Sequence, residues 1–206
     1  MPLRILLVGA SGTIGRAVDA ELASRHDVVR ASANASELKI DVTDVASIER
    51  ALDAAGPLDA VVSAVGEVAF APLAQIEAAP LETSAYGVGL RSKLMGQVNL
   101  TLAARGRLRD GGSITLTTGV LACDPIVAGS SASMVNGALE AFVRAAAIEL
   151  PRGLRINAVS PTVLTESMGA YGAFFRGFES VPAARVTLAY SRSVEGAQTG
   201  RIYTVV

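Results

Sequence analysis

The feature that most constrains the fold is how the chain begins. An unbroken apolar run, Arg4–Val8, predicts a strand buried on both faces, as in a parallel sheet. It ends in the turn G-A-S-G-T-I-G at residues 9–15, after which Val18 and Leu22 follow Ile14 at helical spacing. Parallel strands need crossover connections, so a strand, a glycine turn and a helix predict further strands and helices in alternation.

The alternation continues to the last residue. Further strands are predicted at 28–29, 38–40, 59–64, 113–117, 154–159 and 202–206, and helices at 84–105, 131–150 and 183–192. Asp44 is placed to cap another helix, which carries Val45, Ile48 and Leu52 on its apolar stripe. We therefore expect one domain, residues 1–206, of the doubly wound α/β class with about seven parallel strands.

Composition excludes several classes of protein. Half of the 206 residues are hydrophobic, which is enough for a large core, and a net charge of -1 argues against a nucleic-acid partner. With one cysteine and one histidine, we expect neither a disulfide framework nor a metal site. No apolar run approaches the roughly 18 residues that cross a bilayer, so we expect a cytoplasmic protein without membrane contact.

The glycine turn predicts a phosphate cradle. Glycine lets the backbone approach a pyrophosphate, and the following helix offers free N–H groups and the positive end of its dipole. The spacing is G-x-x-G-x-x-G rather than the commoner G-x-G-x-x-G. A tight turn without a ligand is the alternative.

The end of the second strand bears on the choice of dinucleotide. A carboxylate there would bind the ribose 2′-OH of NAD, but Ser32 and Asn34 offer a hydroxyl and an amide, and the first carboxylate is Glu37. The segment 30–36 therefore favours NADP, with NAD the less favoured cofactor. Arg16 and Arg30 either add positive charge here or are solvated surface residues.

These residues, with later motifs, resemble the short-chain dehydrogenase/reductase family over nearly the whole chain. The landmarks are the glycine turn, D-V at 41–42, S-A-V-G at 63–66, N-G-A-L-E-A-F at 136–142 and R-I-N-A-V-S-P-T-V-L-T at 155–165. The resemblance implies a Rossmann-like sheet and a cofactor site at matching positions. Those positions are Gly9, Ser11, Gly12, Thr13, Ile14 and Gly15 for the pyrophosphate, Asp41 and Val42 for adenine, Ala64 and Gly66 for the adenosine ribose, and Pro161, Val163 and Thr165 for the nicotinamide.

The chain departs from the family where the chemistry is performed. The family's Tyr-x-x-x-Lys falls on Ala132 and Asn136, its serine on Gly119 with Thr118 beside it, and its helix asparagine on Lys93. The family's mechanism uses a tyrosine hydroxyl to shuttle a proton, which alanine cannot do.

Lysine and asparagine have thus exchanged positions. The chain holds only two lysines among 18 basic residues, which hints at a specific need for Lys93. We hypothesise that Lys93 reaches the nicotinamide ribose hydroxyls and that Asn136 orients it, with Thr118 as a third catalytic candidate. The alternative is a surface Lys93 and an Asn136 satisfied in the core.

No replacement proton donor is obvious from the sequence. Ser131, Ser133, Tyr86, Tyr171 and water are candidates, whereas Tyr190 and Tyr203 are expected to pack in the last helix and strand. Cys123 either approaches the site or is a small buried hydrophobe, and His26 caps the first helix or faces solvent. The aromatic residues Tyr171, Phe174, Phe175 and Phe178, with Met168, form either a mobile flap over the substrate or ordinary packing.

Two functions remain open. The first is an NADP(H)-dependent oxidoreductase that acts on a small carbonyl or alcohol with an altered proton relay. The second is a non-catalytic NADP(H)-binding sensor or regulator. A nucleotide-sugar epimerase or dehydratase is disfavoured because those relatives also need the Tyr-Lys pair. The resemblance further implies a homodimer or homotetramer associated through the helices at 84–105 and 131–150.

Overall fold

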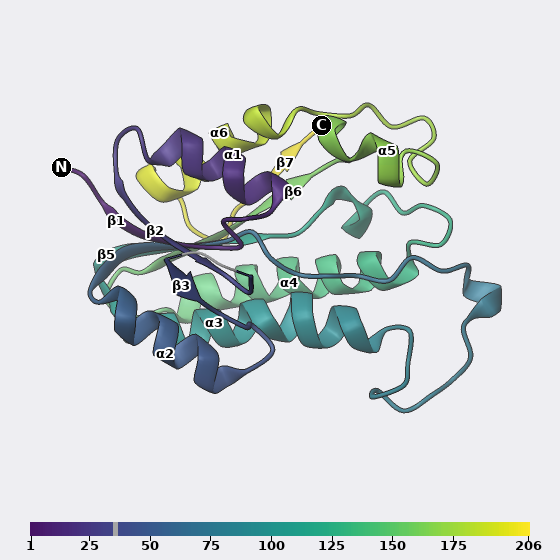
Figure 1. Cartoon of the computed structure of the whole chain (residues 1–206), viewed down its shortest axis with the longest axis horizontal. Helices are drawn as coiled ribbons and strands as arrows, with labels where there is room; N and C mark the ends of the chain where they lie inside the picture. Colours follow the sequence, from purple (N-terminus) through teal and green to yellow (C-terminus); the bar gives the residue numbers. More distant parts are fainter. Residues whose placement is uncertain (35–36) are drawn as a thin grey trace.

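The apolar runs of the chain form one parallel sheet, shown in Figure 1. The computed structural model describes residues 1–34 and 37–206. Its strands are β1 (Arg4–Val8), β2 (Asp27–Ser32), β3 (Leu38–Lys39), β4 (Leu58–Ser63), β5 (Leu108–Thr117), β6 (Arg155–Pro161) and β7 (Ile202–Val205). They lie in the order β3-β2-β1-β4-β5-β6-β7, with every neighbouring pair parallel. This is the predicted doubly wound, Rossmann-like fold, and its order reverses between β1 and β4.

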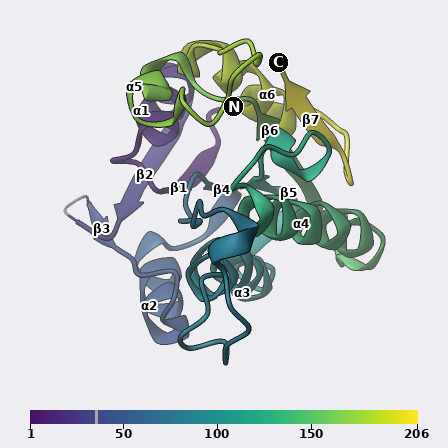
Figure 2. The same ribbon diagram turned by 90° about the vertical axis from the view of Figure 1, so that its right-hand side faces the viewer.

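Helices cover both faces of the sheet, as Figures 1 and 2 show. Their bounds are α1 (Thr13–Leu22), α2 (Val45–Ala55), α3 (Gly96–Ala104), α4 (Ser130–Glu149), α5 (Met168–Tyr171) and α6 (Ala183–Glu195). α1 and α6 pack together on one face, and α2, α3 and α4 lie on the other. None of the helices in the described ranges is long and apolar enough to cross a membrane.

The first strand shows why its run is apolar throughout. Ile5 and Leu7 belong to the core beneath α1 and α6, whereas Leu6 and Val8 belong to the core beneath α2, α3 and α4. All four side chains are fully buried. Successive side chains of a strand point to opposite faces, so a strand covered on both sides buries its side chains on each of them, which favours apolar residues at every position.

Two predicted helical features are wrong in detail. The helix predicted at 84–105 begins at Gly87, and its segment η2 (Gly89–Met95) is a π-helix that leads directly into α3. Val45, predicted on an apolar stripe, is 51% exposed, and Leu102 of α3 is 45% exposed. The buried face of α3 instead includes Gln97, which donates to the carbonyl oxygen of Thr117 at 2.9 Å, so periodicity of apolar residues alone misplaces this face.

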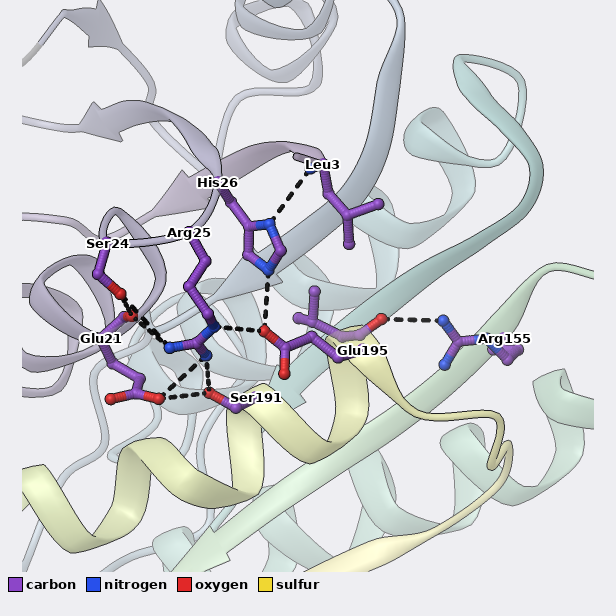
Figure 3. Close-up of polar contacts among 9 residues, drawn as sticks. Leu3, Glu21, Ser24, Arg25, His26, Arg155, Ser191 and Glu195 are labelled. Carbon is purple, nitrogen blue, oxygen red and sulfur yellow. Dashed lines mark hydrogen bonds and ion pairs between the residues drawn. The ribbon is translucent and has the colours of Figure 1, made fainter. Parts of the chain in front are cut away.

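The single histidine ties the ends of α1 and α6 together, as Figure 3 shows. His26 Nδ1 accepts from the Leu3 N–H at 3.2 Å, and Nε2 lies 2.9 Å from Glu195 Oε1, which Arg25 also contacts at 2.9 Å. The His26 side chain is 9% exposed, so the prediction that it faces solvent is wrong, whereas its backbone N–H does cap α1 by donating to the Leu22 carbonyl oxygen at 2.9 Å. The sequence could not show the side-chain contacts because their partners lie far away along the chain.

Candidate functional site

A cavity of about 400 Å³ opens beside the carboxyl ends of β1, β2 and β4, where the strand order reverses. We call it the switch-point cavity. The cofactor candidates that line it are Gly9, Ser11, Gly12, Ser32, Asp41, Val42, Ala64 and Gly66. Ligands of doubly wound sheets bind at this position because the strand ends and helix amino termini converge there.

The glycine turn needs glycine for its own geometry. Gly9 has φ +89, and a Cβ on it would lie 2.5 Å from the carbonyl oxygen of Ala64. A Cβ on Gly15 would lie 2.0 Å from the carbonyl oxygen of Gly9, so the start of α1 packs directly beneath the turn. α1 begins after Gly12 without a side-chain cap and has no acidic residue in its first turn. Its first N–H groups are therefore suited to an anion.

Asp41 is held as an ionised acceptor at the edge of this cavity. Its Oδ1 accepts from the Thr43 hydroxyl at 2.7 Å and from the Thr43 N–H at 2.9 Å. These hydrogen bonds lower the pKa of the Asp41 carboxyl below its ordinary value. The carboxylate is thus charged near neutral pH.

The segment after β2 is partly as predicted. Ser32 is buried and lines the cavity, whereas Asn34 is exposed and does not line it. Residues 35–36, part of the same predicted segment, lie outside the described residues. Arg30 pairs with Asp19 at 2.9 Å and with Glu37 at 3.6 Å, so its charge is matched within the chain.

Two other arginines near the cavity differ in role. Arg16 donates to the carbonyl oxygen of Ser11 and so braces the glycine turn. Arg91, on η2, lines the switch-point cavity, and one of its guanidinium nitrogens donates to the Leu81 carbonyl oxygen at 3.2 Å. Sequence reasoning missed Arg91 because nothing in the local pattern brings η2 to the end of β4.

A second cavity, of about 200 Å³, continues the site toward β5 and β6. We call it the apolar cavity. The predicted residues that line it are Ile14, Lys93, Thr118, Asn136, Pro161 and Val163. The positions at which the resemblance places the family's catalytic residues, Lys93, Gly119, Ala132 and Asn136, all contribute to it. Segments up to 43 residues apart in the chain, from η2, β5 and α4, therefore meet in one place.

The Lys93 side chain passes over Gly66 to reach this cavity. A Cβ on Gly66, which has φ +120, would lie 2.5 Å from Lys93 Cβ and Cγ, so only glycine leaves room for the lysine stem. Lys93 Nζ donates to the carbonyl oxygen of Thr118 at 3.1 Å. Lys93 is half-buried and lines the apolar cavity. This burial lowers its pKa from 10.5 to about 8. It is not a surface lysine.

Thr118 contributes its backbone rather than its hydroxyl. Thr118 Oγ1 lies 3.4 Å from both Glu140 Oε1 and the Val159 carbonyl oxygen, while its carbonyl oxygen receives the Lys93 ammonium. Glu140 is itself buried and pairs with Arg144 at 3.3 Å. Thr118 is therefore fixed from two sides.

Asn136 does not hold Lys93 as hypothesised. It is 3% exposed, and its Oδ1 has no hydrogen-bond partner among the described residues. Within the same residues, no hydrogen bond joins it to Lys93, whose partner is Thr118. A Cβ on Gly119 would lie 3.0 Å from Asn136 Nδ2, so the small residue at 119 accommodates the asparagine.

Several predicted residues lie outside both cavities. Thr13, Gly15 and Thr165 line neither, and Thr165 Oγ1 instead lies 3.1 Å from Ser180 Oγ. Tyr86 is also outside them, with its hydroxyl 3.0 Å from Ser130 Oγ. Cys123 is exposed and does not line the apolar cavity, so both predictions made for it are wrong.

Aromatic residues close the outer end of the apolar cavity. Tyr171 and Phe175 line it, as does Phe70, which the sequence analysis missed. The Phe70 ring lies 5.7 Å from that of Tyr171 and 5.3 Å from that of Phe174. Phe175 is buried in a small core, whereas Tyr171 and Phe174 are 42% and 39% exposed. The segment thus combines packing with exposed rings, and its mobility stays a prediction.

Comparison with known proteins agrees with this architecture. A family model described as enoyl-(acyl carrier protein) reductase matches residues 9–203. L-xylulose reductase from Homo sapiens is 29% identical over 183 residues, which cover 81% of this chain and 73% of that protein. Carbonyl reductase [NADPH] 2 from Sus scrofa is 28% identical over 184 residues, which cover 81% of this chain and 74% of that protein.

Solved structures show the same fold. The protein lin1944 from Listeria innocua is 46% identical, with a TM-score of 0.94 over 99% of this chain and 100% of that one. A small-chain dehydrogenase in complex with NADPH is 21% identical, with a TM-score of 0.83 over 100% and 97%. The match of the family model over residues 9–203, on a sheet of this topology, shows that the chain belongs to the short-chain dehydrogenase/reductase family.

Proposed function

We propose that this chain is an NADP(H)-dependent oxidoreductase that interconverts a small carbonyl compound and its alcohol, with Lys93 as the acid. One observation carries the proposal. The Lys93 ammonium, with its pKa lowered to about 8 by burial, lies in the cavity that also contains Ala132 and Asn136. Near pH 8 such a group exists in both protonation states, as proton transfer requires.

The two cavities fit a dinucleotide that runs from Asp41 to Pro161. The uncapped start of α1 suits its pyrophosphate, and the ionised Asp41 suits an adenine amino group. Ile14, Pro161 and Val163 give an apolar wall suited to the flat face of a nicotinamide. When bound there, NADPH would supply the hydride and be oxidised to NADP⁺.

Three observations support NADP over NAD. Ser32, which lines the switch-point cavity after β2, carries a hydroxyl where a carboxylate would select the ribose 2′-OH. Glu37 accepts the Arg30 N–H at 3.0 Å and does not line the cavity. The carbonyl reductase from Sus scrofa is named for NADPH, and the similar small-chain dehydrogenase structure is a complex with NADPH.

Lys93 would complete the reduction on the carbonyl oxygen. As hydride reaches the carbonyl carbon, the lysine ammonium gives one proton to the oxygen, and the neutral amine recovers a proton from water. Ala132, at the position where the family carries its tyrosine, has no proton to give. Thr118 would aim the ammonium through its carbonyl oxygen, and Asn136, which lines the cavity and has an unpaired Oδ1 among the described residues, would offer a bound ligand an acceptor.

The chain would act as a single dinucleotide-binding domain, residues 1–206, in a homodimer or homotetramer. α3 and α4 present the exposed apolar side chains Leu102, Met134 and Ile148, which suit contact with a second copy. Light scattering of the purified chain tests this association, and a monomeric mass would contradict it.

The test of the reaction uses the chain's two lysines. Lys93→Met should lower kcat for carbonyl reduction by roughly 100-fold or more while leaving the Kd for NADPH within about threefold. Lys39→Met is the matched control, because Lys39 is exposed at the end of β3 and should change neither value. Equal kcat in the two variants would remove Lys93 from the mechanism. Tight NADPH binding without turnover by the wild type would favour the sensor instead.

A further inference from the structure

We infer that the substrate is a small apolar carbonyl compound, such as an aromatic or branched aldehyde or ketone, and not a polyhydroxylated sugar. This inference rests on the proposed function, because it concerns the space beside Lys93. The relatives named L-xylulose reductase act, by their name, on a ketose, so the inference departs from what a transfer of their substrate would suggest.

The walls of the apolar cavity carry the inference. Apart from residues that the resemblance gives to the cofactor, they consist largely of Val68, Phe70, Val120, Leu121, Tyr171 and Phe175. Val120, Leu121 and Phe175 are buried in one small core, and Val68 and Phe70 pack against it. The wall is therefore preformed and apolar where a substrate would lie.

The polar groups of the cavity are set within a mostly apolar wall. Lys93 is the one charged residue among the described residues that line it. The Thr118 hydroxyl is engaged at 3.4 Å with Glu140, so the uncharged polar side chains that face a ligand are those of Asn136, Thr162, Ser167 and Tyr171. A ketose would bury several hydroxyls against aromatic and aliphatic side chains. Each unpaired hydroxyl would weaken binding by roughly tenfold to a hundredfold.

Size points the same way. The apolar cavity measures about 200 Å³, and a nicotinamide against Ile14, Pro161 and Val163 would take up part of that volume, so the space left for a substrate is smaller still. Phe70 and Tyr171, whose ring centroids lie 5.7 Å apart, bound its outer end. This space suits a compact substrate that directs one oxygen at Lys93 and packs its apolar body against these rings.

The experiment measures binding and turnover by the full chain with NADPH present. Benzaldehyde, L-xylulose and phenylpyruvate are compared by saturation-transfer NMR and by NADPH consumption. We expect benzaldehyde to bind at least roughly 100-fold more tightly than L-xylulose, and to be the better substrate where turnover occurs. Preferred binding of L-xylulose would overturn the inference. Preferred binding of phenylpyruvate would also overturn it, since Lys93 would then pair with a carboxylate.

Matched variants locate the binding. Phe70→Ser should weaken benzaldehyde binding by roughly tenfold, whereas Leu73→Ser, on the same loop but 68% exposed and outside this cavity, should not. An equal loss of benzaldehyde affinity in the two variants would show that benzaldehyde binds outside the apolar cavity. A titration with NADPH alone separates the two proposals: no cofactor binding refutes the proposed function, whereas cofactor binding with the wrong carbonyl preference refutes only the substrate class.

Discussion

Replacing Lys93 by methionine should change how the stability of the protein depends on pH. The unfolded chain protonates this lysine with its ordinary pKa of 10.5, whereas burial in the folded chain lowers the pKa to about 8. Between these values the unfolded state binds more protons, so the folded state gains stability as pH rises. Below about pH 8 the wild type carries the full cost of a buried ammonium.

The magnitude follows from the two pKa values. A pKa difference of one corresponds to about 1.4 kcal/mol, so the cost is about 3 kcal/mol at pH 7 and under about 1 kcal/mol at pH 10. From pH 7 to pH 10, the free energy of unfolding of the wild type should therefore rise by at most about 2.5 kcal/mol relative to that of Lys93→Met. Partial exposure through the cavity reduces this figure. Titrations of tyrosines and arginines cancel because both proteins contain them.

The assay is urea denaturation of wild type, Lys93→Met and Lys39→Met at pH 7 and pH 10. Lys39 is exposed, so its variant should follow the wild type at both pH values. The quantity compared is the free energy of unfolding of the wild type minus that of Lys93→Met. If this difference is the same at pH 7 and pH 10, the assignment of a buried ammonium is refuted. If the difference falls as the pH rises, folding favours the charged form of Lys93.

Three further perturbations probe the frame around the site. Gly9→Ala sets a methyl 2.5 Å from a backbone carbonyl at φ +89, so it should lower the free energy of unfolding by more than about 1 kcal/mol in urea denaturation and weaken NADPH binding. Tyr190→Phe removes a buried hydroxyl 2.5 Å from Thr117 Oγ1 and should cost about 1 kcal/mol; unchanged stability would contradict that hydrogen bond's role. Partial burial raises the pKa of the Glu195 carboxyl, but hydrogen bonds from His26 and Arg25 lower it by more, so the net shift of the pKa is downward. In urea denaturation, the free energy of unfolding of the wild type should exceed that of Glu195→Gln by under about 1 kcal/mol above about pH 5. This difference should vanish as the pH falls, and a difference that grows instead would contradict the lowered pKa.

The sequence predicts the fold well because the strongest signals are local. The run Arg4–Val8, the glycine turn and the capping Asp44 are each decided by neighbours within a few residues, and the structure confirms them. That the sheet is parallel follows from the alternation of strands and helices, because parallel strands need crossovers, whereas the order of the strands comes from the structure.

The site is predicted less completely because it depends on packing between distant segments. Arg91 and Phe70 escape sequence reasoning since their place at the cavities comes from how η2 and the loop after β4 fold back. The same holds for the Thr118 carbonyl that receives Lys93, because a backbone oxygen carries no sequence signal. The role of Thr165 stays a prediction: a motif gives its position, and its hydroxyl lies beside that of Ser180.

If the switch-point cavity and the apolar cavity together hold NADP(H), a fluorescence titration of the full chain with NADPH should give a saturable signal at one dinucleotide per chain, and NADH should bind more weakly. A signal that saturates with neither nucleotide would show that the two cavities do not form a dinucleotide site. Tighter binding of NADH would show that Ser32 and Glu37 do not select NADP.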